Sequence, residues 1–257
     1  MKLFCYTYGH NEIDLLPLKK KWCDYHGLTM RYFDNESTDG SKEWAESVNI
    51  LAGEIESDGA FDLRLILPEL NEDLKFENPD WFCMLGVDLF ICPTSAIRLC
   101  DFIYTFGNDF DCLENKYANI CFTGSESQDG DLRHFDRAAI KGEYSMAFDK
   151  YTLMVKNHES AFMAADKINI PAWWKPSQEA KDWWLINFGH TKSAAEREET
   201  FERRKLAWKR GLTEFAGAHY LTGSALDWTY PREGTISIAA NPTLSLAHAN
   251  LLKQIYE

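Results

Sequence analysis

The chain has 257 residues, a formal net charge of −13, 45% apolar residues and 14% aromatic residues. This composition suffices for a packed core, and the length is within the range of one α/β domain. The acidic charge repels phosphate backbones and anionic lipid heads, which argues against broad nucleic-acid binding and against membrane-surface binding.

Cysteine and apolar patterns indicate the cellular compartment. The seven cysteines are spread through segments with core character and include no CxxC pair. This arrangement argues against a zinc cage or a disulfide framework and predicts reduced thiols. The first residues, MKLFCYTYGHNE, do not form a secretory signal, and no segment reaches the apolar length that spans a bilayer. We therefore expect a cytoplasmic protein without a membrane span.

The first fifty residues alternate between strand and helix patterns. Strand formers fill residues 3–8, and apolar residues recur at helical spacing over 14–26 before Gly27 ends the helix. A second strand is expected over 28–33 and a second helix over 41–51. This alternation predicts βαβ units and a parallel sheet flanked by helices.

The elements expected next are less regular. A short strand is expected at 63–67, followed by a polar loop up to Pro79. WFCMLGVDLFICP (81–93) has the pattern of a buried strand that is interrupted at Gly86-Val87-Asp88, and a helix is expected over 94–106.

The remainder of the chain is expected to hold a strand region at 144–155 and a helix within 191–210. That last segment has seven lysines and arginines against four glutamates, which fits either a solvated helix or a dock for an anionic ligand. The sequence shows no internal repeat and no low-complexity linker. We therefore predict one domain at 1–190 and a helical and loop-rich extension at 191–257 that packs on it.

Polar side chains follow three of the expected strands where each strand ends. Asn11 and Glu12 follow the first strand, Asp34 and Asn35 follow the second, and Asp88 lies at the interrupted strand. In an open α/β sheet, ligands bind beyond the carboxyl ends of the strands. The sequence therefore predicts a binding site formed by these residues.

Asn11-Glu12 before a helix, and FDNESTDGS (33–41) after the second strand, resemble the N-terminal signature of family-2-type glycosyltransferases with the GT-A nucleotide-sugar fold. The family pattern fits residues 1–45 without gaps. The resemblance implies an α/β, GT-A-like fold with a mostly parallel central sheet. It also implies transfer of a sugar from a nucleotide-sugar donor to an acceptor hydroxyl.

The residue types and the resemblance together give candidate roles to individual residues, which fall into three groups. The donor-binding candidates are Asn11, Glu12, Asp34, Asn35 and Lys192. The catalytic candidates are Asp149, as a base, and Lys150, as a partner of the donor phosphate. The acceptor-side candidates are His158, Trp173 and Trp174, for which a surface position and ordinary packing are the alternatives.

A divalent cation, Mn²⁺ or Mg²⁺, is also implied. The family carries a metal-binding aspartate pair where this chain has Gly86-Val87-Asp88, so only Asp88 remains. The family's later metal-binding histidine is matched by Asn187 in one register, while His190 lies three residues on. In the family the second aspartate is usually the direct metal ligand, so Asp88 is expected to suffice to place positive charge at the leaving diphosphate. A cap of the strand end is the alternative role of Asp88.

Other functions stay open at this point. The chain lacks the first aspartate of the family's metal-binding pair, so a nucleotide-sugar-binding protein without catalytic activity is an alternative. A nucleotidyltransferase of similar topology is opposed by YGHNEIDLLP, which lacks a glycine- and arginine-rich phosphate loop. The family implies a glycan or lipid-linked acceptor, whereas the basic segment 191–210 allows a base in DNA.

Overall fold

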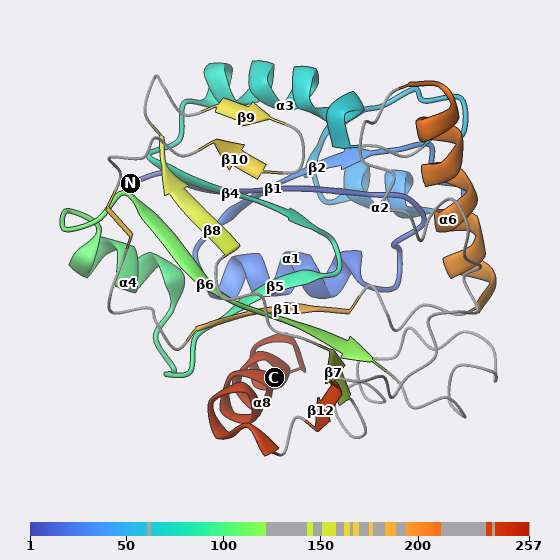
Figure 1. The fold of residues 1–257 in the computed structure, drawn as a ribbon. Coiled ribbons are helices and arrows are strands. Elements are labelled where there is room, and N and C mark those ends of the chain that lie inside the picture. Colours follow the sequence, from blue (N-terminus) through green and yellow to red (C-terminus); the bar gives the residue numbers. More distant parts are fainter. Residues whose placement is uncertain are drawn as a thin grey trace.

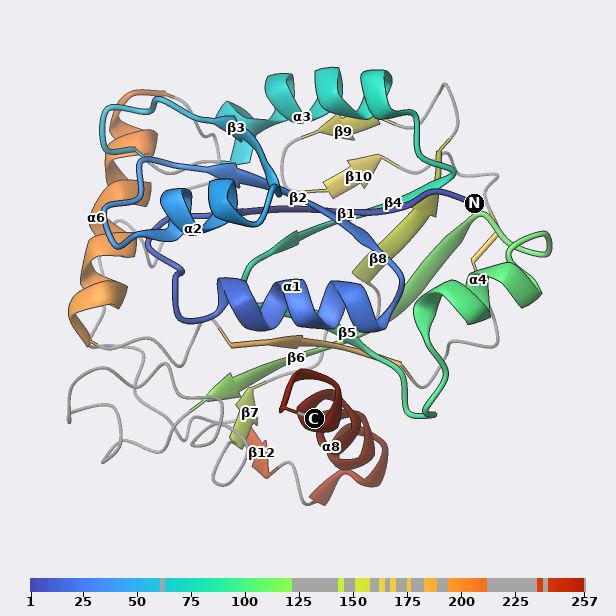
Figure 2. The ribbon, with the colours of Figure 1, turned by 180° about the vertical axis from the view of Figure 1, so that it is seen from behind.

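The fold is α/β, as the sequence predicts. In a computed structural model, a ten-stranded sheet crosses the molecule and helices cover both of its faces (Figures 1 and 2). The structure describes residues 1–60, 63–121, 143–145, 151–157, 162–164, 167–169, 175–176, 183–188, 194–211, 235–237 and 240–256.

Four N-terminal strands form the parallel part of the sheet. β1 (Leu3–Gly9) lies between β2 (Thr29–Asp34) and β4 (Trp81–Gly86), and β3 (Leu51–Glu54) extends the sheet beyond β2. Gly9 pairs with Asp34 and Tyr8 pairs with Gly86, so the carboxyl ends of these strands are level. The residues that follow β1, β2 and β4 therefore leave the sheet at one edge.

The later strands continue the sheet mostly by antiparallel pairing. β8 pairs with β4, β6 with β8, β7 with β6 and β12 with β7, while β11 joins β5 to β6. A separate pair, β9 and β10, lies against α3. The bounds are β5 Leu89–Cys92, β6 Cys112–Cys121, β7 Glu143–Ser145, β8 Tyr151–Lys156, β9 Phe162–Ala164, β10 Lys167–Asn169, β11 Trp184–Asn187 and β12 Thr235–Ser237.

Five of the described helices bury apolar side chains against the two faces of the sheet, and a sixth lies at the carboxyl edge (Figures 1 and 2). Their bounds are α1 Leu16–Tyr25, α2 Ser41–Ser47, α3 Leu63–Glu77, α4 Leu99–Phe106, α6 Ala194–Lys209 and α8 Pro242–Tyr256. In β1, Leu3 and Cys5 pack with α1, α4 and α8, whereas Phe4 and Tyr6 pack with α3 on the other face. This alternation is the period-two pattern of a strand buried on both sides.

Two expectations for residues 41–79 are wrong. The second helix ends at Ser47, and Leu51 begins β3. The strand expected at 63–67 and the polar loop after it are instead the helix α3, whose buried Ile66, Leu70 and Leu74 recur at helical spacing. Pro68 sits within this helix, and the dense apolar run before it has the appearance of a strand. Burial of one face of this segment stabilises the helix, because tertiary packing outweighs the local preference for a strand.

His26 joins three helices beneath the sheet. The Leu99 amide at the start of α4 donates to Nδ1 at 3.1 Å, and Nε2 lies 3.0 Å from Gln254 Oε1 in α8. Burial lowers the pKa of His26 to about 3. The unfolded chain, with a pKa near 6.5, therefore takes up a proton first as the pH falls, and stability is lost below about pH 6.5.

We expect this histidine to lower the free energy of unfolding by about 1 kcal/mol between pH 7.5 and pH 5.5. Urea denaturation of the wild type and of His26→Gln at both pH values measures the effect. The variant should lose correspondingly less stability over this interval. An equal loss in both proteins would contradict the assignment.

Candidate functional site

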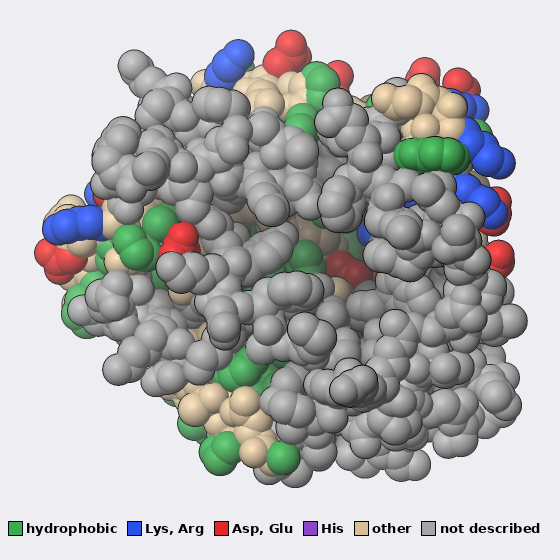
Figure 3. Space-filling model, viewed as in Figure 1, with side chains coloured by type: hydrophobic (Ala, Val, Ile, Leu, Met, Phe, Trp, Pro, Cys, Tyr) green, Lys and Arg blue, Asp and Glu red, His purple; other side chains and the backbone are tan. Residues whose placement is uncertain are grey.

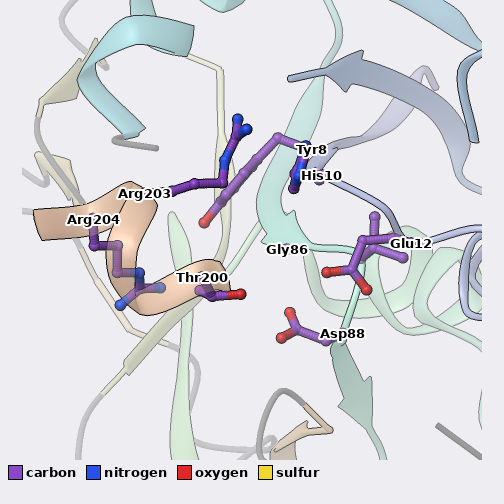
Figure 4. Close-up of a pocket in the computed structure, with 10 residues that line it drawn as sticks. Tyr8, His10, Glu12, Gly86, Asp88, Thr200, Arg203 and Arg204 are labelled. Carbon is purple, nitrogen blue, oxygen red and sulfur yellow. The ribbon is translucent and has the colours of Figure 1, made fainter. Parts of the chain in front are cut away.

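A pocket lies at the carboxyl ends of β1 and β4, facing α6 (Figure 4). Its volume is about 80 Å³. The lining residues come from the two strand ends and from α6: Tyr8, Gly9, His10, Glu12, Gly86, Val87, Asp88, Thr200, Arg203 and Arg204.

The loop after β1 is held by the loop after β2. Asn11 has a positive φ of 54°, which asparagine tolerates better than most residues. Its amide donates to Ser37 Oγ at 2.9 Å, and its Oδ1 accepts from the Thr38 amide at 2.8 Å. The Glu12 amide donates to Ser41 Oγ at 2.9 Å. These bonds fix the Glu12 backbone, and its buried side chain turns toward the pocket (Figure 4).

Asp34 and Asn35 are buried, with 2% and 1% of their surface exposed. The Asp34 carboxylate accepts from the Tyr32 hydroxyl at 3.0 Å and from the Ser37 amide at 2.9 Å. The Asn35 side chain donates to Ile55 O at 3.1 Å and to Ser57 Oγ at 3.0 Å. In the structure both residues hold loops together at the carboxyl edge, and their contact with a donor stays a prediction.

Glu36 fills a cradle of backbone amides. Its carboxylate accepts from the amides of Ser57, Asp58 and Gly59 at 2.9–3.0 Å and from the Ser57 hydroxyl at 2.6 Å. Partial burial raises the pKa of Glu36, but the bonds from Ser57 and Gly59 and the charge of Arg203 outweigh it and lower the pKa to about 2. No role is predicted for this residue from the sequence.

α6 packs across the carboxyl ends of β1 and β2 (Figures 1 and 2). Arg203 Nη2 donates to Asn35 Oδ1 at 3.0 Å, to Asn35 O at 3.2 Å and to Ala60 O at 3.3 Å. His10 lies between Asn35 O and Glu199 Oε1, at 2.7 Å from each. The basic helix is therefore part of the edge at which the three polar clusters gather.

The turn that carries Asp88 is braced by backbone contacts. The Asp88 carbonyl accepts from the Phe188 amide at 2.8 Å, and the buried Lys19 donates its ammonium proton to the Leu89 carbonyl. Asn187 pairs with Leu89 at the end of β11, so it lies beside this turn without lining the pocket. The Asp88 carboxylate faces the pocket (Figure 4).

The structure brings together five of the sequence candidates and leaves others untested. Asn11, Glu12, Asp34, Asn35 and Asp88 lie at one edge. Apart from Asn187, the remaining candidates lie outside the described residues: Asp149, Lys150, His158, Trp173, Trp174, His190 and Lys192. No site role is predicted from the sequence for His10 or Thr200. The positive charge of 191–210, and the resemblance of this segment to a family helix of arginines and lysines, pointed to Arg203 and Arg204.

Three further observations concern the described residues. They contain no group of three or more His, Cys, Asp and Glu side chains suited to a metal ion, although two carboxylates line the pocket. None of the helices within them is long and apolar enough to cross a bilayer. The six described cysteines are free, as the sequence predicts.

Comparison with known proteins gives likenesses in structure only. No family model matches the chain, and no curated protein matches it. TarS 1-349 from S. aureus in complex with UDP superposes with a TM-score of 0.39 and 12% identity, over 99% of this chain and 89% of that chain. A longer TarS chain from S. aureus superposes with a TM-score of 0.37 and 16% sequence identity, over 86% of this chain and 41% of that chain.

The chain thus spans less than half of that longer TarS chain. CMP:2-keto-3-deoxy-manno-octonic acid synthetase complexed with CTP superposes with a TM-score of 0.30 and 9% identity, over 61% of this chain and 74% of that chain. At these TM-scores the likenesses carry no argument about this chain. Its function is argued from its own residues.

Proposed function

We propose that the chain is a glycosyltransferase that moves a sugar from a nucleotide-sugar donor to an acceptor hydroxyl. The observation that carries the proposal is the pocket at the carboxyl edge, with Glu12 and Asp88 on the sheet side and Arg203 and Arg204 on α6. Carboxylates that hold a cation and arginines nearby suit a diphosphate, whose negative charge grows as the sugar leaves.

The position of each residue determines the role that we propose for it in binding the donor. Asn11, Asp34 and Asn35 hold the loops after β1 and β2 in register, and so shape the edge that the nucleoside would contact. Arg204, on the exposed side of α6, would bind a donor phosphate. Asp149 as the base and Lys150 as a phosphate partner stay candidates from the sequence.

A divalent cation fits the residues at Asp88. A Cβ added to Gly86 would lie 2.5 Å from Asp88 Oδ1, so the glycine leaves the space that this carboxylate occupies. Carboxylate oxygens are the ligands that Mg²⁺ and Mn²⁺ prefer. Such an ion, held by Asp88, would supply positive charge to the leaving diphosphate.

A base in DNA gains no support as acceptor. Lys and Arg side chains are intermixed with Asp and Glu along α6 at the edge of the molecule (Figure 3). Lys205 pairs with Glu202, and Arg203 is directed to Asn35 and Glu36. The described side chains of α6 therefore do not form a surface of a single charge sign, as binding a phosphate backbone requires. A glycan or lipid-linked acceptor remains the proposal.

Thermal unfolding with a panel of UDP-, GDP-, CDP- and dTDP-sugars, with and without Mn²⁺, tests the function. A ligand at roughly 100 times its Kd adds about 2.7 kcal/mol to the stability. For a chain of this size we expect a rise in Tm of roughly 5–10 °C.

Release of the nucleoside diphosphate from the stabilising donor then separates an enzyme from a silent binding protein. Release that depends on the intact protein supports the transferase. Binding without any release, with or without a panel of sugar acceptors, would support the silent binding protein. If no nucleotide sugar and no nucleoside diphosphate raises the Tm, the proposed function is wrong.

A further inference from the structure

One lysine of α1 is completely buried. Lys19 has 0% of its surface exposed, and its ammonium donates to the Leu89 carbonyl. The ammonium nitrogen also lies 4.6 Å from the centroid of the Trp22 ring and 4.7 Å from that of the Phe90 ring. Lysine is almost never fully buried unless it is paired, because an ammonium loses its hydration there. Within the described residues its partners are one carbonyl and two aromatic rings, which replace only part of that hydration.

The Lys19 side chain reaches the open edge of β5. Among the described strands, β5 pairs with β11 alone, and α1 lies beside it (Figures 1 and 2). Alternate carbonyls of a strand point to the same side, and buried carbonyls need donors. The Leu89 carbonyl accepts from Lys19, and two residues on, the Ile91 carbonyl accepts from Trp22 Nε1 at 3.3 Å. A neutral donor thus satisfies the farther carbonyl, and a charged donor satisfies the one next to Asp88.

The contact with Lys19 holds one side of the turn at Asp88. Leu89 directly follows Asp88, whose carboxylate faces the pocket (Figure 4). The Asp88 carbonyl accepts from the Phe188 amide, just beyond the end of β11, at 2.8 Å. Successive carbonyls are therefore held by different elements, one by the segment after β11 and the next by α1. Without the Lys19 donor, the second of these contacts is lost.

We propose that Lys19 is a positioning residue, which fixes the turn through the Leu89 carbonyl and so orients the Asp88 carboxylate toward the donor. This role rests on the proposed function, in which Asp88 serves the leaving diphosphate. A hydrogen bond from a charged donor is roughly twice as strong as a neutral one, which suits a contact that holds a functional turn. A buried charge of this kind costs stability, so its benefit lies in the geometry that it imposes.

Lys19→Met keeps the aliphatic length of the side chain and removes the donor and the charge. With the nucleotide sugar that raises the Tm most, kcat for diphosphate release should fall at least about 10-fold, because a displacement of about 1 Å costs up to roughly 100-fold. KM should change less, since the buried Lys19 cannot touch the donor. The Tm should stay the same or rise, because replacing a buried charge by an apolar side chain is often neutral or stabilising.

Amide hydrogen exchange, followed by NMR without any donor, reports on the turn itself. The Phe188 amide, bonded to Asp88 O, and the Val87 amide, bonded to Tyr8 O at 3.3 Å, lie on either side of it. In Lys19→Met both amides should exchange at least about 10-fold faster. The amides within β1 and β2 should keep their wild-type rates, which a general loss of stability would not allow.

Two matched variants of α1 make the comparison specific. Lys20→Met removes the same charge at the next position, where the side chain is partly exposed and pairs with Asp24. It should change neither turnover nor exchange. Trp22→Phe removes the other donor from α1 to β5, the one to Ile91. It should leave turnover and the exchange of the Phe188 amide unchanged, even where the Tm falls.

A double-mutant cycle tests whether Lys19 acts through Asp88. In an Asp88→Asn background, Lys19→Met should slow diphosphate release by less than about 2-fold, because the carboxylate that it positions is gone. A further loss as large as in the wild-type background would overturn the role of Lys19.

Other outcomes separate this role from the proposed function. Wild-type turnover in Lys19→Met, or an equal loss in Trp22→Phe, would overturn the positioning role and leave the function standing. So would a Lys19→Met protein that does not fold, because an unchanged or higher Tm is expected. If no nucleotide sugar is turned over, the function is wrong, and unchanged exchange at Val87 and Phe188 would show that Lys19 does not fix the turn either.

Discussion

Replacing Asp88 by asparagine is expected to slow the release of nucleoside diphosphate from the nucleotide sugar by about 10²–10³-fold, the loss typical when one stabiliser of developing charge is removed. Asparagine keeps the shape of the side chain but deletes the charge that holds a hard cation. The backbone contacts of the turn, from Phe188 to Asp88 and from Lys19 to Leu89, do not involve the carboxylate. We therefore expect the free energy of unfolding to change by no more than about 0.5 kcal/mol.

Gly86→Ala provides a matched variant, because it leaves Asp88 in the sequence but not in its place. The added Cβ would lie 2.5 Å from Oδ1, so the carboxylate must move. Donor turnover and Mn²⁺ affinity should both fall. Gly86→Asp, which restores the acidic pair of the resembled family, should not tighten Mn²⁺ binding for the same reason.

Initial rates of diphosphate release at a series of Mn²⁺ concentrations measure these effects. Full activity of Asp88→Asn, or wild-type activity that resists strong chelation, would show that the reaction needs no cation at Asp88. Cationic side chains such as Arg204 would then have to stabilise the negative charge of the leaving diphosphate. A gain in Mn²⁺ affinity in Gly86→Asp would contradict the account of Gly86.

Arg203→Met is expected to lower the free energy of unfolding by about 2–3 kcal/mol, the cost of leaving buried acceptors without their charged donor. The Arg203 side chain is 11% exposed, and its Nη2 reaches acceptors on Asn35, Glu36 and Ala60. Methionine keeps much of the aliphatic packing, so the loss reports the polar contacts. α6 should then separate more readily from the loops after β2 and β3.

Arg204→Met is the control, since Arg204 is the next residue of α6 and is exposed. Its stability should stay within about 0.5 kcal/mol of the wild type. Urea denaturation gives the free energies, and amide hydrogen exchange in α6 reports its detachment. Equal losses in the two variants would show that Arg203 does not anchor the helix.

The sequence by itself determined the alternation of strands and helices in the first fifty residues. It also determined that Asn11, Asp34 and Asp88 lie at or just beyond strand ends. These features are local, because side-chain periodicity, capping residues and glycine stops act within a few positions along the chain. A parallel sheet follows from them, and it places the candidate site at its carboxyl edge.

The tertiary structure decided which side chains meet at that edge. Glu12 and Asp88 are 76 positions apart in the sequence, and the register between β1 and β4 brings them to one pocket. Arg203 lies 168 positions from Asn35, and no local pattern shows that α6 packs against the loop after β2. For α3, the burial of one helical face outweighed an apolar run with strand character. Contacts of this kind depend on the path of the whole chain, which local periodicity does not encode.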